Sequence, residues 1–241
     1  MPPRTDTVWQ TEPIASFYIE GVRGAIPLAQ HQLDVMQRVI AACGIPVRRV
    51  LDLGCGDGIL AAALLDRFPE AEAVLVDFSE TMLAAARRRF AGRASPTRVV
   101  NADYGVAAWT GAVAALAPFD AIVSGYSIHH QPDARKIEIY REIFALLAPG
   151  GVFLNLEHVS SATPWVESLF DELFIDHLAR HHGNKPHEEI ARTYHERPDK
   201  TANILAGVED QCAWLREIGY SDVDCYLKIF ELTVFGGRRA R

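Results

Sequence analysis

Short apolar runs alternate with amphipathic segments through the central part of the chain. Five apolar runs have the length of buried strands, at residues 48–53, 73–77, 97–101, 119–124 and 151–157. Three intervening segments have apolar residues at helical spacing, at 58–68, 80–90 and 134–147. This alternation predicts an α/β fold, a doubly wound and mostly parallel sheet that helices cover on both faces.

The pattern differs at the two ends of the chain, although one domain over residues 1–241 is expected. A helix that stops at Gly44 precedes the first strand, so residues 1–46 are predicted to form an N-terminal helical cap on a core of residues 47–159. Residues 160–206 hold a long amphipathic helix and a polar stretch, and we expect this helical insertion to lie over the carboxyl edge of the sheet as a lid. Residues 207–241 are predicted to add a closing helix and two strands.

Composition and charge narrow the functional classes. The net charge of −7 disfavours a nucleic acid as substrate. The four cysteines form no C-x-x-C pair, and His177 and His181 lack an H-E-x-x-H context, so no metal site is expected. No apolar stretch reaches the roughly 18 residues of a membrane span, and the first residues lack the pattern of a signal peptide. The sequence therefore predicts a cytoplasmic protein without a membrane partner.

Three glycines follow the first predicted strand at alternate positions, in "VLDLGCGDGIL". Gly54, Gly56 and Gly58 spell G-x-G-x-G, and Ile59 stands where a dinucleotide fingerprint needs a small residue. No Lys-Ser or Lys-Thr follows, which excludes a P-loop. Asp77 ends the second strand, at the distance from the loop, about 20 residues, where an acidic side chain binds a ribose. The pattern thus indicates a ligand with a ribose but without a pyrophosphate.

Five segments in order extend this interpretation. "VLDLGCGDG", "VLVDFS", "VVNAD", "FDAIVSGYSIHH" and "LLAPGGVFLNLEH" resemble the successive motifs of the class I S-adenosylmethionine-dependent methyltransferases, over roughly residues 45–160. The resemblance implies a seven-stranded Rossmann-like methyltransferase fold, S-adenosylmethionine as cofactor and S-adenosylhomocysteine as product.

The resemblance also implies a role for each matching residue. Asp52 would support the loop, and Gly54 and Gly56 would pass beneath the methionine part of the cofactor. Asp77 would bind the ribose, and Ser127 would lie near the sulfonium. Phe78 and Met82 would sandwich the adenine, and Asp103, with Tyr104 beside it, would accept a hydrogen bond from the adenine amino group. Tyr18 and Arg23, in "ASFYIEGVRGAIP", are candidates to face the cofactor, although surface positions suit both equally.

Methyl transfer from a sulfonium is an in-line displacement, in which alignment supplies much of the acceleration. We expect a small-molecule acceptor with an oxygen or a nitrogen nucleophile, and a homodimer is compatible with the sequence. The candidates for a general base are His129 and His130 after the fourth strand, and Glu157 and His158 after the fifth. For the adjacent histidines, shaping of the pocket is the alternative role.

Two other functions stay open at the level of sequence. One is an enzyme that uses or makes a carboxylated S-adenosylmethionine for tRNA modification, which needs a cation for the added carboxylate, with Arg23 as a candidate. The other is a non-catalytic module that binds S-adenosylmethionine, because the acceptor side of the chain has no diagnostic motif.

Overall fold

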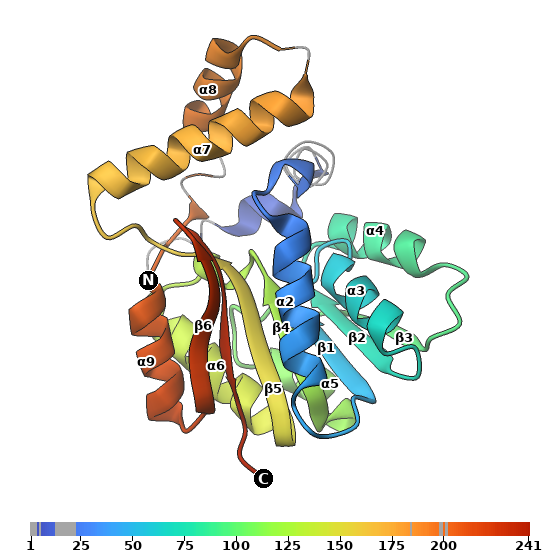
Figure 1. Cartoon of the computed structure of the whole chain (residues 1–241). Helices are drawn as coiled ribbons and strands as arrows, with labels where there is room; N and C mark the ends of the chain where they lie inside the picture. The colour runs from blue at the N-terminus through green and yellow to red at the C-terminus, as the bar shows by residue number, and fades with distance from the viewer. Residues whose placement is uncertain (1–3, 5, 13–22, 184, 198–199, 201) are drawn as a thin grey trace.

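The computed structural model describes the chain except for residues 1–3, 5, 13–22, 184, 198–199 and 201. A seven-stranded sheet forms its centre, helices cover both faces, and two further helices lie beyond one end of the strands (Figure 1). This is the doubly wound α/β architecture predicted from the alternating pattern. None of the helices in the described part has the length and apolar character needed to span a bilayer.

The strands follow the order β3-β2-β1-β4-β5-β7-β6. Their bounds are β1 Arg49–Leu53, β2 Glu72–Asp77, β3 Thr97–Asn101, β4 Phe119–Gly125, β5 Leu147–His158, β6 Ser221–Ile229 and β7 Leu232–Arg238. Strands β1 to β5 are parallel, whereas β7 pairs antiparallel with both β5 and β6. The strand order changes direction between β1 and β4, and ligands bind at the carboxyl ends of strands at such a point.

Each face of the sheet has its own helical layer. Helices α2 Ala29–Ala41, α3 Ile59–Arg67 and α4 Glu80–Phe90 cover one face, and α5 Trp109–Val113, α6 Asp133–Leu146 and α9 Val208–Ile218 cover the other (Figure 1). Along β1, Val50 packs in the first layer, whereas Leu51 and Leu53 pack in the second. Side chains of a strand alternate between faces, so two buried faces require the continuous apolar runs seen in the sequence.

The structure differs from the sequence prediction at several ends of elements. β5 begins at Leu147 rather than at residue 151, because Leu147 pairs with Phe119 before a shift in register. Short 3-10 helices occupy stretches without a strong periodic pattern: η1 Asp6–Gln10, η3 Arg23–Ala25, η4 Ala114–Leu116 and η5 Ile128–His130.

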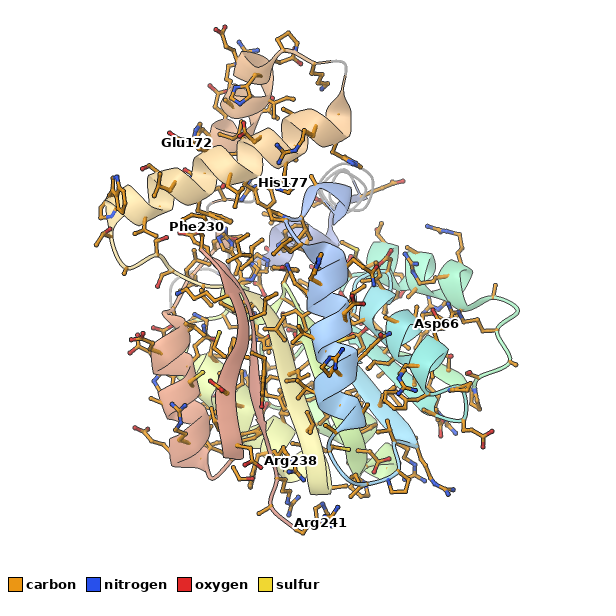
Figure 2. The ribbon with its side chains drawn as sticks, viewed as in Figure 1. Asp66, Glu172, His177, Phe230, Arg238 and Arg241 are labelled. Carbon is orange, nitrogen blue, oxygen red and sulfur yellow. The ribbon has the colours of Figure 1, made fainter. Side chains whose placement is uncertain are left out.

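Helices α7 Pro164–His182 and α8 His187–Glu196 form a layer beyond the strand ends (Figure 1). Thr163 caps α7 by accepting a hydrogen bond from Val166 N. The buried side chains of this layer pack together with Ala25 and Leu232, and they are Phe170, Phe174, Ile175, Leu178, Ile190 and Tyr194. Figure 2 shows Phe230, at the tip of the β6–β7 hairpin, close to α7, and Arg238 at the opposite end of the sheet.

Candidate active site

The turn between β1 and α3 has positive φ at all three glycines. The angles are +66° at Gly54, +54° at Gly56 and +79° at Gly58, and residues with a side chain are strained in this region. A Cβ on Gly54 would lie 2.0 Å from Ser127 Oγ and 2.6 Å from Ser127 Cβ. Glycine at position 54 is therefore required both by the turn and by the close approach of the segment that follows β4.

Polar side chains tie the ends of the central strands together around this turn. Asp52 is buried, and its Oδ2 accepts a hydrogen bond from Ala61 N at 3.0 Å, which joins β1 to α3. Tyr104 follows β3, and its hydroxyl donates to Ser127 O at 2.9 Å and lies 2.5 Å from Ser127 Oγ. The ends of β1, β3 and β4 thus surround one point of the sheet edge.

Asp77 lies at the end of β2 and is only 6% exposed. Its Oδ2 accepts from Gly56 N at 2.9 Å, and its Oδ1 accepts from Ser79 N at 2.8 Å. Burial raises the pKa of Asp77 to about 6, and backbone hydrogen bonds from Ser79, Gly56 and Phe78 oppose that rise. Each carboxylate oxygen has a second lone pair beyond the backbone bond it accepts, so both can also accept from the hydroxyls of a ligand.

A cavity with an empty volume of about 530 Å³, which includes space open to solvent, lies over this turn. Seven residues predicted to contact the cofactor line it, namely Gly54, Gly56, Asp77, Phe78, Met82, Tyr104 and Ser127. Asp6 and Trp9 from η1, with Cys55, Gly125, Tyr126 and His130, complete its wall. We refer to this space as the cofactor cavity.

The walls of the cofactor cavity fit the nucleoside part of S-adenosylmethionine. The turn at Gly54 leaves no room for a Cβ, so only backbone lies beneath a ligand there. Asp77 offers a buried carboxylate to a ribose, and Phe78 and Met82 offer apolar contact to an adenine. These residues would hold the cofactor, and their roles stay predictions.

Asp103, unlike most of the residues predicted to contact the cofactor, lies outside the wall of the cofactor cavity. It is not among the residues that line the cofactor cavity, and its side chain is 35% exposed. Arg4 binds its carboxylate, with Nη2 donating to Oδ1 at 3.0 Å, and Gly105 N donates to the same oxygen at 2.8 Å. A contact between Asp103 and adenine therefore stays a prediction, and Arg4 is a partner that the motif did not indicate.

The remaining predicted cofactor contacts lie outside the described side chains. Tyr18 falls in the part of the chain that the structure does not describe, and of Arg23 only the backbone, in η3, is described. Within the described residues, no group of three or more histidine, cysteine or acidic side chains is placed to hold a metal ion. His181, one of the two histidines considered as ligands, packs its ring against Gly24.

A second cavity, with an empty volume of about 550 Å³, adjoins the first. The two cavities share Trp9, Tyr126 and His130 as lining residues. Helices α7 and α8 supply aromatic side chains to the second cavity, namely Phe170, Phe174 and Tyr194. We refer to it as the acceptor cavity, because a ligand here would meet a cofactor at the three shared side chains.

His129 and Glu157 form a buried pair at the acceptor cavity, where His129 lines the wall. His129 Nδ1 lies 2.6 Å from Glu157 Oε1, and the backbone N of His129 donates to Glu157 Oε2 at 3.0 Å. Asn155 Nδ2 and His158 N also donate to the Glu157 carboxylate, at 3.2 and 2.9 Å. Burial raises the pKa of Glu157, and the bonds from His158 and Asn155 oppose that rise.

The environment of His129 keeps its ring neutral. Burial lowers its pKa well below the ordinary value, with further lowering from His158, Lys136 and Arg197, while a hydrogen bond with Asn203 opposes the shift. A neutral imidazole carries one N–H, and the carboxylate of Glu157 selects Nδ1 as its position. Nε2 then holds a lone pair that is able to accept a proton.

Two further histidines border the same cavity. The ring of His130 lies against that of His129, tilted by 51° with centroids 3.9 Å apart, and its Nδ1 lies 3.1 Å from Ala202 O. Burial lowers the pKa of His130 well below its ordinary value. His158 Nε2 lies 2.7 Å from Glu231 Oε2. The structure thus brings together all four candidates for the base, and it pairs His158 with Glu231, a partner that the sequence did not indicate.

Asp6, Trp9 and Tyr126 are site residues that sequence reasoning missed. Asp6 and Trp9 lie near the N-terminus, far from every motif, and no local pattern marks them. Tyr126 adopts a φ of +51°, which is rare for an aromatic residue, and its hydroxyl donates to Gln32 Oε1 at 2.5 Å. Its position between the two cavities follows from this backbone conformation, which the motif around it does not predict.

Comparison with known proteins finds a methyltransferase family over the central part of the chain. Residues 50–151 match a family described as a methyltransferase domain. An uncharacterized methyltransferase of Mycobacterium tuberculosis strain H37Rv is 39% identical over 115 residues, which cover 48% of this chain and 51% of that protein. The chain therefore spans about half the length of the curated relatives it matches.

Solved structures extend the likeness in fold to nearly the whole chain. An O-methyltransferase family protein from Burkholderia thailandensis superposes with a TM-score of 0.66 at 18% identity, covering 98% of this chain and 63% of that one. Human N-acetylserotonin methyltransferase, in complex with S-adenosylmethionine, superposes with a TM-score of 0.65 at 13% identity, covering 100% and 60%. The chain is thus similar in sequence to a methyltransferase domain over residues 50–151, and similar in fold to solved methyltransferases over nearly its whole length.

Proposed function

We propose that the chain transfers a methyl group from S-adenosylmethionine to a hydroxyl oxygen of a small molecule, with His129 as the general base. The observation that carries this proposal is the His129–Glu157 pair. It presents a neutral imidazole, oriented by a carboxylate, on the wall of a cavity that adjoins the cofactor cavity.

When bound, S-adenosylmethionine supplies a methyl group on a positively charged sulfur, which an acceptor oxygen displaces in line. The residues of the chain must align the acceptor and remove its proton. His129 accepts the hydroxyl proton at Nε2, and the Glu157 carboxylate stabilises the resulting imidazolium through Nδ1–H. A hydroxyl group benefits from such a base, whereas an amine needs only to be held neutral, so the pair favours an oxygen acceptor.

The walls of the acceptor cavity favour a molecule with an aromatic or apolar body. Phe170 and Phe174 are buried on α7, and Tyr194 is buried on α8, with its ring tilted against that of Phe174 at 5.6 Å between centroids. Such rings pack against flat apolar ligands and exclude water from the reacting atoms. Residues 160–206 are in this proposal a lid that shapes the acceptor side and leaves the nucleoside contacts to the sheet.

Arg197 favours a second candidate, a carboxylated S-adenosylmethionine. Its guanidinium lies 4.6 Å from the ring centroid of Tyr194, and the residue lines the acceptor cavity. A cation on this wall suits an added carboxylate as well as an anionic acceptor. Mass spectrometry of the nucleoside that copurifies with the protein separates the two: a carboxylated mass supports the second candidate.

The proposal is tested by isothermal titration with S-adenosylmethionine, followed by a methyl-transfer assay over phenols, alcohols, amines and carboxylic acids. Transfer to a hydroxyl acceptor that is lost in His129→Ala supports the proposed function. Binding without transfer to any acceptor would instead favour a non-catalytic module. Transfer only to amines, at equal rates in both proteins, would remove the role of His129 as base.

A further inference from the structure

Arg4 joins two carboxylates from distant parts of the chain. Its Nε donates to Asp6 Oδ1 at 2.9 Å and its Nη2 to Asp6 Oδ2 at 2.6 Å. The same guanidinium bonds both oxygens of Asp103, through Nη2 to Oδ1 at 3.0 Å and through Nη1 to Oδ2. All three guanidinium nitrogens are therefore engaged, and residues 99 positions apart are connected.

The Arg4 guanidinium lies close to Phe78, at the end of the cofactor cavity that is predicted to hold the adenine. Its central carbon lies 5.8 Å from the ring centroid of Phe78, which lines that cavity. A Cβ on Gly105 would lie 2.6 Å from the Arg4 guanidinium, so a glycine at position 105 provides the space for it. Arg4 thus lies beside Phe78 and Asp103, two of the three residues that the motifs assign to adenine.

Helix η1, which follows Arg4, forms one wall of the cofactor cavity. Asp6 is 4% exposed, lines the cavity, and also accepts a hydrogen bond from Gln131 Nε2 at 2.7 Å. Trp9 lines both cavities, and its ring lies 5.4 Å from that of His130 between centroids. The contacts of Arg4, Asp6 and Trp9 therefore attach η1 to the carboxyl edge of the sheet.

We infer that Arg4 is a cofactor-positioning residue, which holds η1 closed over the nucleoside of S-adenosylmethionine by bridging Asp6 to Asp103. This inference rests on the proposed function, because it assigns the nucleoside to the cofactor cavity. With the bridge formed, η1 holds Asp6 and Trp9 in the wall of the cavity that encloses the ligand. With the bridge broken, η1 is released from the connection after β3, and the nucleoside is able to leave.

Because the bridge is charged and partly exposed, its strength should depend on the salt concentration. The Arg4 and Asp103 side chains are each 35% exposed, so dissolved ions screen their attraction. Release of S-adenosylhomocysteine from the wild-type protein is therefore expected to accelerate with salt. A purely apolar contact of η1 would not respond in this direction, because added salt does not weaken apolar contacts.

The experiment measures the dissociation rate of S-adenosylhomocysteine by stopped-flow tryptophan fluorescence, since Trp9 lines the cavity. It compares the wild type with Arg4→Ala, Arg4→Lys and Asp103→Asn at low and high sodium chloride. The matched control is Arg98→Ala, which removes an ion pair with Glu72 at 2.7 Å between β3 and β2, at a position that lines neither cavity. Circular dichroism and thermal melting check that each variant is folded.

Arg4→Ala is expected to release S-adenosylhomocysteine about five- to twentyfold faster than the wild type and to lose most of the salt response, in keeping with a partly exposed, charge-assisted bridge. The release rates of Arg4→Lys and Asp103→Asn should lie between those of the wild type and Arg4→Ala. The release rate of Arg98→Ala should stay within about twofold of the wild-type rate. Equal release rates in Arg4→Ala and the wild type would overturn the inference. Slower release from Arg4→Ala would overturn it too, by showing that Arg4 competes with the nucleoside for Asp103. If the wild type binds no S-adenosylhomocysteine, the proposed function fails together with the inference.

Discussion

His129 Nδ1 lies 2.6 Å from Glu157 Oε1, and the two residues follow or end neighbouring parallel strands, β4 and β5. The carboxylate accepts the N–H of the ring on one side, which leaves the other ring nitrogen as the acceptor. Because Glu157 is fully buried and also bonded by Asn155 and His158, it holds the imidazole in one orientation. The pair therefore supplies both the direction and the protonation state that a general base requires.

Removal of the imidazole is expected to impair turnover without loss of the cofactor. His129→Ala should lower kcat for a hydroxyl acceptor by about 10²- to 10⁴-fold, the usual contribution of a general base. Affinity for S-adenosylhomocysteine should change by less than about twofold, because His129 does not line the cofactor cavity. Steady-state kinetics and isothermal titration check both values, with His187→Ala, an exposed histidine on α8, as control. Parallel losses of kcat and of affinity would indicate a structural role.

The dependence of the methyl-transfer rate on pH should report the protonation of the His129 ring. Burial lowers the pKa of His129 well below 6.5, so the base is already deprotonated at neutral pH. The rate is therefore expected to stay constant near pH 7 and to fall only as pH drops through a value below 6.5. Rates under saturating acceptor, measured for the wild type and for the residual activity of His129→Ala, provide the comparison. An acidic limb that persists unchanged in His129→Ala would assign it to another group.

Asp77 should make cofactor affinity dependent on pH. Its pKa of about 6 means that the carboxylate is ionised above pH 6 and becomes protonated below it. In the predicted role the ionised form accepts from both ribose hydroxyls, so affinity for S-adenosylhomocysteine should be constant well above pH 6 and weaken as pH falls through that value. Asp77→Ala should weaken binding by about 1.5 to 3 kcal/mol at pH 7.5, the range for hydrogen bonds to a charged group. Isothermal titration of a well-folded Asp77→Ala protein with an unchanged Kd would contradict the ribose assignment.

Gly54 and Gly92 form a matched pair that separates backbone strain from steric overlap. Both have positive φ, +66° and +81°, but a Cβ at Gly92 would meet nothing within 4 Å, whereas one at Gly54 would lie 2.0 Å from Ser127 Oγ. Gly92→Ala should cost about 1 to 2 kcal/mol in the free energy of unfolding. Gly54→Ala should cost more and abolish cofactor binding, because the β4 end must move. Urea unfolding measures the difference, and equal costs would show that Ser127 shifts without penalty.

The local parts of the site were predictable because each depends on a short stretch of chain. The glycines at 54, 56 and 58 specify a turn with positive φ, and Asp77 ends the adjacent apolar run. In a parallel sheet the carboxyl ends of neighbouring strands meet at one edge, so these residues were expected to converge. The same rule placed His129 and Glu157 at that edge, although not which nitrogen faces which oxygen.

Other features depend on contacts that no local pattern encodes, so only the tertiary structure decided them. Arg4 reaches Asp103 across 99 positions, and nothing near either residue in the sequence indicates the other as a partner. The acceptor cavity arises where α7 and α8 pack against Tyr126 and Leu232, and apolar helix faces specify burial without specifying the surface they bury against. The sequence by itself determined the sheet, the glycine turn and the place of Asp77 at the carboxyl end of β2. The enclosure of the cofactor cavity by η1 and the pairing of His129 with Glu157 came from packing between segments that are distant along the chain.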